Sequence, residues 1–377
     1  LFDDVTLMPF VKEMKNILRS LANEKITLTK KECLIANDEI ENRLGQKFEL
    51  NRNELEIAID RMISLGEDRT EALMERGENR ISDIYTLGSD LKDWIMSPHD
   101  KYIKSVKVDE DGESLHAACI DPFDVTTFLR RTKGVVHMSG TLQPLEQYVK
   151  VMALPADTVT KIYPSPFPPE NRSVIYLGNV TTRYEDMQKD PSIFSRMEKN
   201  IAKLCNNVDK NTLVFFPSYS MMRKMRPFLD RDVKKDAYWE ESGQQKMTMK
   251  ALNEFRKGRN GVFFTVMGGS IAEGIDFPGE ELCFAIIVGI PYPPPTLETR
   301  AMSDLFDQKY GRGVGWRYTS EVPALRKMQQ AIGRLIRTET DRGMAVIFDN
   351  RCSKYASKLG AKLSTDPLAD VTRFFDE

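Results

Sequence analysis

The clearest chemical pattern in the sequence is the run Gln330-Ala331-Ile332-Gly333-Arg334-Leu335-Ile336-Arg337. Polar groups spaced at i, i+4 and i+7 share one face of a helix, so we expect Gln330, Arg334 and Arg337 to lie together. Two guanidinium groups on one face suit the terminal phosphate of a nucleotide and the charge of its transition state. Gly333 leaves room for a close approach to that face. The alternative is two surface arginines on an ordinary helix.

A second pattern is the segment Gly268-Gly269-Ser270-Ile271-Ala272-Glu273-Gly274-Ile275-Asp276-Phe277-Pro278-Gly279, which follows the apolar run Val262–Val266. A glycine-rich turn after a strand exposes backbone N–H groups that bind phosphate. We expect Glu273 and Asp276 to act as acceptors toward a ribose, a water molecule or the arginine pair. The alternative is a plain glycine turn between two strands.

A third pattern is Phe215-Phe216-Pro217-Ser218-Tyr219-Ser220, in which an apolar strand runs into a serine. Ser218 is a favourable N-cap, and the helix that it begins offers free N–H groups to an anion such as a nucleic-acid phosphate. The alternative is a serine that caps the helix and does nothing more.

A fourth pattern is Gly311-Arg312-Gly313-Val314-Gly315-Trp316-Arg317-Tyr318, where arginines alternate with glycines and aromatic residues. We expect a loop here. Its composition suits a surface that stacks on bases and follows a phosphate backbone. The alternative is a mobile loop with Trp316 folded inward.

The elements that must position these segments alternate between strands and helices. The strand candidates are residues 174–177, 212–216, 262–266, 282–290 and 345–348. The helix candidates are residues 219–229, 247–257, 297–309 and 322–336. This alternation predicts an α/β fold with a parallel sheet covered on both faces, and ligands at the carboxyl ends of its strands.

The first 100 residues differ in composition, because no proline occurs between Pro9 and Pro98 and about a third of the residues in that stretch are charged, with both signs mixed. Two capping boxes are expected, Thr29 with Glu32 and Asn51 with Glu54. The face predicted after the first box is formed by Cys33, Ala36, Ile40 and Leu44, with Gly45 ending the helix. This region is therefore expected to be mainly helical and to carry no chemistry.

The bulk composition excludes several classes of protein. The formal net charge of −2 and the pI of about 6.1 give no broad basic field, so any nucleic-acid site must be local. Five separated cysteines without a CxxC pair and three unpaired histidines predict neither a metal site nor disulfides. We found no membrane-spanning run and no signal peptide, so a cytoplasmic, intracellular setting is expected.

Together the motifs resemble the superfamily 2 DNA helicases of the XPD type, which include the bacterial DinG proteins. Ser139-Gly140-Thr141-Leu142 is similar to helicase motif III. The 216–220 region is similar to motif IV, the 268–279 segment to motif V and the 330–337 run to motif VI. The resemblance covers about residues 114–360, and the prolines of residues 290–295 suggest an archaeal member.

The resemblance implies an ATP-dependent helicase that uses ATP and Mg²⁺ and moves 5′ to 3′ on single-stranded and forked duplex DNA, with DNA repair as its setting. The implied catalytic residues are Arg334, Arg337, Gln330 and Glu273. The implied nucleotide-binding residues are Gly274, Asp276 and Gly333, and the implied coupling residues are Ser139, Gly140 and Thr141. The implied DNA-binding residues are Ser218, Tyr219, Arg183, Tyr184, Gly269, Ser270, Trp316 and Arg351.

The implied organisation is a helical arch-like segment over residues 1–105, the end of motor domain 1 over 106–160, and a RecA-like motor domain 2 over 161–377. The sequence contains neither GxxxxGK[ST] nor an Asp-Glu-Ala-His box, and its cysteines do not match the cluster ligands of the family. We therefore expect a monomeric part that is inactive alone, with the other motor half and a 4Fe–4S cluster upstream.

Three alternatives remain. The first is a non-enzymatic DNA-binding or regulatory fragment of motor ancestry. The second is a double-strand translocase or an RNA helicase built on the same motor. A RecA-like metabolic kinase is disfavoured, because the motif VI arginines and the Trp316 segment would have no task in it.

Overall fold

The computed structural model describes residues 4–27, 31–109, 112–121, 123–269, 271, 275, 277 and 279–376. The chain divides into two compact units. Unit 1 comprises residues 1–133, 151–153 and 295–315, and unit 2 comprises residues 134–150, 154–294 and 316–377. None of the helices in the described part of the chain has the length and apolar character needed to span a membrane.

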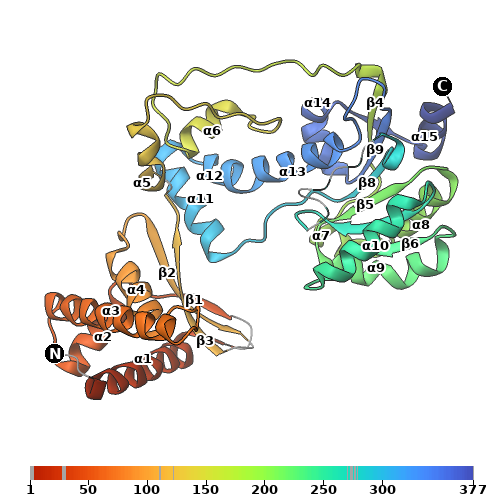
Figure 1. Cartoon of the computed structure of the whole chain (residues 1–377). Helices are drawn as coiled ribbons and strands as arrows, with labels where there is room; N and C mark the ends of the chain where they lie inside the picture. Colours follow the sequence, from red (N-terminus) through yellow and green to blue (C-terminus); the bar gives the residue numbers. More distant parts are fainter. Residues whose placement is uncertain are drawn as a thin grey trace. The chain divides into compact units, whose positions relative to one another are not determined.

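Unit 1 combines a helical bundle with a small antiparallel sheet, as Figure 1 shows. Its longer helices are α1 (Asp4–Lys25), α2 (Glu39–Phe48), α3 (Arg52–Glu75), α4 (Asp83–Met96) and α11 (Leu297–Tyr310), and α5 (Phe123–Thr126) is a single short turn. Its strands, in sheet order, are β1 (Glu32–Leu34), β2 (Tyr102–Asp109) and β3 (Gly112–Cys119). Apolar side chains of α1 to α4 form one core with Val106 of β2. The prediction that residues 1–100 are mainly helical is confirmed.

The helix boundaries in unit 1 confirm one predicted cap and correct another. Asn51 and Glu54 form the predicted capping box, with hydrogen bonds of 3.0 and 2.8 Å. The predicted helix around Cys33 is wrong, because this residue lies in β1 opposite Val106 of β2. Thr29 lies outside the described residues.

Gly45 was also wrongly predicted to end its helix. Helix α2 continues to Phe48 and closes on Glu49, which adopts the left-handed conformation with φ 56°. A Cβ on Gly45 would lie 2.7 Å from the Leu50 carbonyl oxygen, so this glycine allows the chain after α2 to fold back closely.

Unit 2 contains a seven-stranded sheet in which every described pairing is parallel. The strand order is β10-β4-β9-β8-β5-β7-β6. The strands are β4 (Arg172–Leu177), β5 (Thr212–Phe216), β6 (Ala237–Trp239), β7 (Val262–Val266), β8 (Phe284–Val288), β9 (Gly343–Phe348) and β10 (Ala361–Ser364). The predicted parallel α/β sheet is confirmed.

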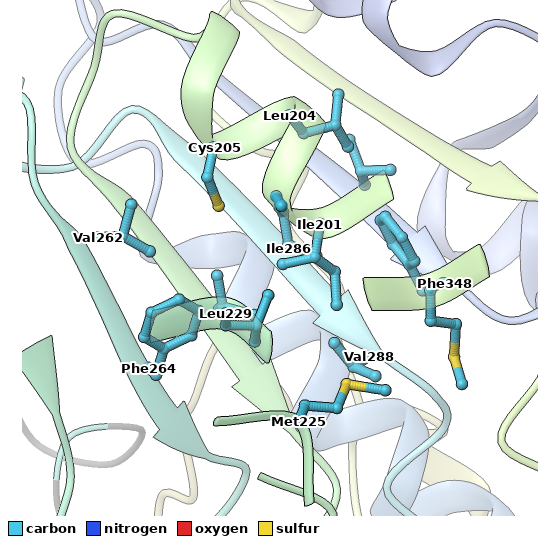
Figure 2. Close-up of a cluster of buried hydrophobic side chains, with 14 of the residues drawn as sticks. Ile201, Leu204, Cys205, Met225, Leu229, Val262, Phe264, Ile286, Val288 and Phe348 are labelled. Atoms are coloured by element: carbon cyan, nitrogen blue, oxygen red, sulfur yellow. The ribbon is translucent and has the colours of Figure 1, made fainter. Parts of the chain in front are cut away.

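Helices cover both faces of this sheet. Successive side chains along a buried strand point to opposite faces, so each face is covered by its own layer of helices. Helices α10 (Gln245–Lys257), α13 (Val322–Gly333) and α14 (Ala356–Leu359) share one core with it. Helices α8 (Ser192–Asn207), α9 (Tyr219–Asp232) and α15 (Pro367–Asp376) share the other. Figure 2 shows this second core, where Ile201 and Leu229 meet Phe264 and Ile286 of the sheet. Core packing occupies both faces of the sheet, so functional groups are expected at its edges.

The predicted loop at residues 311–318 is partly helical. Residues Val314–Trp316 form α12, and a π-helical segment at Arg317–Glu321 continues directly into α13. Gly315 permits tight packing, since its Cβ would lie 1.9 Å from the Ser303 carbonyl oxygen. The alternation of glycine and arginine therefore reflects close backbone contacts as well as turns.

Candidate functional site

Three of the candidate segments follow strands of the sheet of unit 2. Residues 217–220 follow β5, the 268–279 segment follows β7 and residues 349–351 follow β9, and the carboxyl ends of these parallel strands lie at one edge. The 330–337 run instead follows α13 and precedes β9, where Leu335 lies against Gly343 at the start of that strand. Main-chain hydrogen bonds continue between the segments beyond the strands. Met267 N–H donates to the Phe216 carbonyl at 2.8 Å, and Gly289 N–H donates to the Phe348 carbonyl at 3.3 Å.

Ser218 begins α9 after β5, as its sequence predicted. Its backbone is extended, and its hydroxyl accepts a hydrogen bond from Met221 N–H at 3.2 Å. Tyr219 follows, and its hydroxyl donates to Glu240 Oε1 at 3.0 Å. The helix start is therefore well fixed, and the Tyr219 hydroxyl is engaged within the protein.

The glycine turn after β7 lies beside this helix start. Gly268 has φ +81°, a conformation that favours glycine, and Gly269 N–H donates to the Val266 carbonyl at 2.8 Å. Ser270, Glu273, Gly274 and Asp276 lie outside the described residues, so their predicted roles stay predictions.

Arg334 lies just past the end of α13 and is 8% exposed. One Nη of its guanidinium donates to the Ile275 carbonyl oxygen, which belongs to the glycine-rich segment. The next two residues, Leu335 and Ile336, pack into the hydrophobic core that α10, α13 and α14 share with the sheet. A buried guanidinium therefore joins the 330–337 run to the 268–279 segment.

We predicted that Gln330, Arg334 and Arg337 share one helix face, and this prediction is wrong for Arg337. Helix α13 ends at Gly333, so Arg337 lies on an exposed turn. The Asp341 carboxylate accepts from the backbone N–H groups of Arg337 at 2.7 Å and Thr338 at 2.8 Å, which closes this turn. Burial acts to raise the pKa of Asp341, but these hydrogen bonds outweigh it and lower the pKa.

Gln330 reaches the segment that resembles motif III. Its Nε2 donates to Thr141 Oγ1 at 3.4 Å, and Thr141 N–H in turn donates to Ser139 Oγ at 3.2 Å. A Cβ on either Gly140 or Gly333 would have open space around it among the described residues. The structure thus brings Gln330 and Thr141 together.

Arg326 contacts residues 142–147, and the sequence did not predict this contact. Its guanidinium donates to Leu142 O at 2.9 Å, to Gln143 O at 3.2 Å and to Gln147 Oε1 at 2.8 Å. Burial lowers its pKa. It precedes Gln330 by four residues, so the i, i+4 rule was the signal that could have found it.

Arg351 is held by a buried carboxylate. Asp349 is fully buried after β9 and accepts from Arg351 Nε at 2.8 Å and from Arg351 Nη2 at 2.7 Å. Asp349 also accepts from Thr182 N–H and from the Thr182 hydroxyl, each at 3.0 Å. Burial acts to lower the pKa of Arg351, but the hydrogen bonds and charge of Asp349 outweigh it and raise the pKa. Sequence reasoning missed Asp349 as the residue that holds this arginine.

Three further predicted DNA-binding residues lie on exposed parts of unit 2. Trp316 is 48% exposed, and its ring centroid lies 5.6 Å from that of Tyr292, so it is not folded inward. Tyr184 is 72% exposed at the start of α7 (Tyr184–Lys189). Arg183 forms a 2.7 Å ion pair with Glu185.

Comparisons with known proteins agree with this architecture. A helical and beta-bridge domain model matches residues 1–186, and a helicase C-terminal domain model matches residues 201–366. A probable ATP-dependent helicase of Methanocaldococcus jannaschii is 28% identical over 84% of this chain and 48% of its own length. The XPD helicase subunit of general transcription and DNA repair factor IIH of Arabidopsis thaliana is 28% identical over 65% of this chain and 36% of its own length.

Solved structures give the same fold. An apo structure of XPD aligns with 96% of this chain and 72% of its own, with a TM-score of 0.59 at 22% identity. Xpd4 of S. tokodaii aligns with 95% of this chain and 71% of its own, with a TM-score of 0.55 at 18% identity.

The parallel sheet and its two helical layers form a RecA-like fold, and the helicase C-terminal domain model matches most of this unit. The two family models and the relatives together support an XPD-type superfamily 2 helicase, of which this chain covers the C-terminal part. It spans between roughly a third and a half of the two curated relatives described above.

Proposed function

We propose that this chain is the second motor half of an ATP-dependent helicase that translocates 5′ to 3′ on single-stranded DNA and opens forked duplexes during DNA repair. One observation carries the proposal. Arg334 is 8% exposed at the end of α13 and bonds to the Ile275 carbonyl of the glycine-rich segment. A guanidinium held in this way is preorganised to bind a charged ligand.

Arg334 and Arg337 would bind the terminal phosphate of ATP from the second motor half. Their guanidinium groups can donate several hydrogen bonds to phosphate oxygens and stabilise negative charge there. Bound ATP would supply the driving force for domain closure. In the described part of the chain no group of three or more His, Cys, Asp or Glu side chains is placed to hold a metal ion. We place the Mg²⁺ site and the 4Fe–4S cluster in the N-terminal motor half because the family resemblance implies them there.

The nucleic acid would run past the carboxyl edge of unit 2. Ser218 starts a helix of 14 residues, whose N–H groups favour a phosphate. Trp316 and Tyr184 offer half-exposed or exposed rings for base stacking. Arg183, Gly269, Ser270 and Arg351 complete the proposed path. The boundaries 1–105, 106–160 and 161–377 remain the proposed domain division of this monomeric, intracellular protein.

Strand displacement tests this function. The full-length helicase is incubated with forked DNA duplexes carrying a 5′ or a 3′ tail, and with the matching RNA duplexes. We expect ATP-dependent opening of the 5′-tailed DNA. The chain alone should hydrolyse no ATP, because its sequence contains no GxxxxGK[ST]. Opening of RNA alone would support the RNA helicase instead.

A second candidate is a DNA-binding or regulatory fragment of motor ancestry. The missing phosphate-binding sequence is the observation that favours it. In that case the chain would bind single-stranded DNA, and neither ATP nor the N-terminal half would change its affinity. Dependence of DNA affinity on ATP in the full-length protein would rule this candidate out.

A further inference from the structure

Glu240 is a buried carboxylate to which the proposed function gives no role. It follows β6 and is 2% exposed. Its backbone N–H donates to the Phe264 carbonyl at 2.9 Å, which continues the pairing of β6 with β7. Burial of a carboxylate is costly unless hydrogen bonds compensate it, so its partners indicate what it holds.

These partners come from two of the functional segments. Oε1 accepts from the Tyr219 hydroxyl at 3.0 Å, at the start of α9. Oε2 accepts from the Thr265 hydroxyl at 2.6 Å and from Val266 N–H at 3.1 Å, at the end of β7. Hydrogen bonds to a charged acceptor are stronger than neutral ones. One carboxylate therefore ties the start of α9 to the strand that leads into the glycine turn.

The same carboxylate explains why residue 269 is a glycine. A Cβ at Gly269 would lie 2.6 Å from both oxygens of Glu240, a distance that real side chains do not adopt. The φ of Gly269 is not in the left-handed region, since the described glycines with positive φ near this turn are Gly268 and Gly279. The glycine is thus required by the close approach of Glu240 and not by backbone conformation.

We propose that Glu240 is a positioning residue. It holds the Ser218–Tyr219 helix start and the Gly268–Gly269 turn in a fixed position relative to each other, so that both contact the same strand of nucleic acid. This inference rests on the proposed DNA path. Each segment alone is an ordinary cap or turn, and only their mutual position makes a continuous set of phosphate donors. Burial, together with the charge and hydrogen bond of Glu240, raises the pKa of Tyr219 to about 12.

The test compares Glu240→Gln with Glu241→Gln in the intact chain. Gln has nearly the same shape but lacks the charge. Glu241 is the adjacent carboxylate and forms a 2.7 Å ion pair with Arg226, away from the glycine turn. Fluorescence anisotropy measures the affinity for a labelled single strand across a salt series. We expect Glu240→Gln to bind about tenfold more weakly with a salt slope lower by about one contact, and Glu241→Gln to match the parent.

An alkaline titration of tyrosinate absorbance supplies a second readout. Glu240→Gln should lower the pH at which Tyr219 ionises, with Tyr219→Phe identifying its signal. A loss of overall stability alone would not change the salt slope. If the parent binds DNA and Glu240→Gln keeps both affinity and slope, the positioning role is overturned. If the parent itself binds no single strand, the proposed DNA path fails, and this role fails with it.

If Glu240→Gln folds poorly, two substitutions that compensate each other in side-chain size provide an alternative test. Gly269→Ala should weaken binding, because its methyl group collides with the carboxylate. Adding Glu240→Asp shortens the acid by one methylene and should restore part of the lost affinity. Equal binding by Gly269→Ala and the parent, or no recovery in the double variant, would contradict the proposal.

Discussion

Two buried carboxylates hold segments at the ends of strands in the same sheet, and their partners differ. Asp349 follows β9 and is matched by the guanidinium of Arg351, with hydrogen bonds of 2.7 and 2.8 Å. Glu240 follows β6, and its described donors are the hydroxyls of Tyr219 and Thr265 and one backbone N–H. Asp349 forms an ion pair, whereas the three hydrogen-bond donors named for Glu240 are neutral groups.

This difference predicts different consequences when each site is changed. Removal of Asp349 leaves Arg351, whose side chain is 23% exposed, without its counterion. An uncompensated, largely buried charge is strongly destabilising. Removal of the charge on Glu240 leaves hydroxyls that can rotate toward other acceptors. We therefore expect Asp349 to matter chiefly for stability and Glu240 chiefly for alignment of the nucleic-acid segments.

The largest expected effect is on the free energy of unfolding. Asp349→Ala should lower it by about 3–5 kcal/mol, because Arg351 then lacks its partner. Glu240→Gln should lower it by about 1–3 kcal/mol, the cost of weakened buried hydrogen bonds. Urea denaturation of both variants measures the difference. The double variant Asp349→Ala with Arg351→Ala should lose less than the sum of the single losses. Equal losses at the two carboxylates would break the comparison.

The next effect concerns DNA beside the Asp349 site. Arg351 lies 5.5 Å from the Tyr292 ring centroid, and Trp316 packs against that ring. If a base stacks on Trp316, Trp316→Ala should weaken single-strand binding about tenfold. Fluorescence anisotropy measures it, with Tyr163→Ala, another exposed aromatic of unit 2, as the control. Parent-like binding by Trp316→Ala would place the strand on the Glu240 side only.

A third effect is the response to alkaline pH on the Glu240 side. The pKa of Tyr219 is raised from 10.0 to about 12 by burial and by Glu240. Between these values the unfolded chain loses a proton that the folded chain keeps, so the free energy of unfolding falls as pH rises. The stabilisation is complete below about pH 10 and lost by about pH 12. Tyr219→Phe should show a smaller fall over this window, and an identical fall would contradict the assignment.

The smallest effect expected is on the salt dependence of binding. Arg351→Ala should lower the slope of log affinity against log salt by about one contact if Arg351 also touches a phosphate. If the arginine serves only as the counterion of Asp349, the slope should stay that of the parent. A salt series on the folded variant distinguishes these two roles.

The sequence predicts best where burial is complete. Strands β5 and β7 match their predicted bounds to the residue, because each is a fully buried apolar run with a turn signal after it. Strand β1 was missed because its three residues depend on pairing with β2, which lies some seventy residues further along the chain. Non-local pairing overrides local helix signals in this region.

The candidate site shows the same limit. The four motif segments could be found from their residue types and spacing. The end of α13 before Arg337 could not, because the Asp341 carboxylate closes the turn from four residues downstream. The role of Glu240 could not be predicted, since it depends on contacts with segments far away in the chain, and the i, i+4 spacing of Arg326 from Gln330 does not by itself show that Arg326 contacts Leu142.

The central claim is that Arg334 and Arg337 bind ATP from the segment between α13 and β9. The most direct measurement is DNA-stimulated ATP hydrolysis by the full-length helicase carrying Arg334→Ala or Arg337→Ala. The exposed Arg373→Ala serves as the control. Each motif change should reduce turnover about a thousandfold or more, with DNA affinity nearly unchanged in the absence of nucleotide. Lysine should rescue poorly, because it lacks the forked guanidinium. Normal turnover by Arg337→Ala would contradict the role assigned to this turn, and normal turnover by both variants would contradict the claim as a whole.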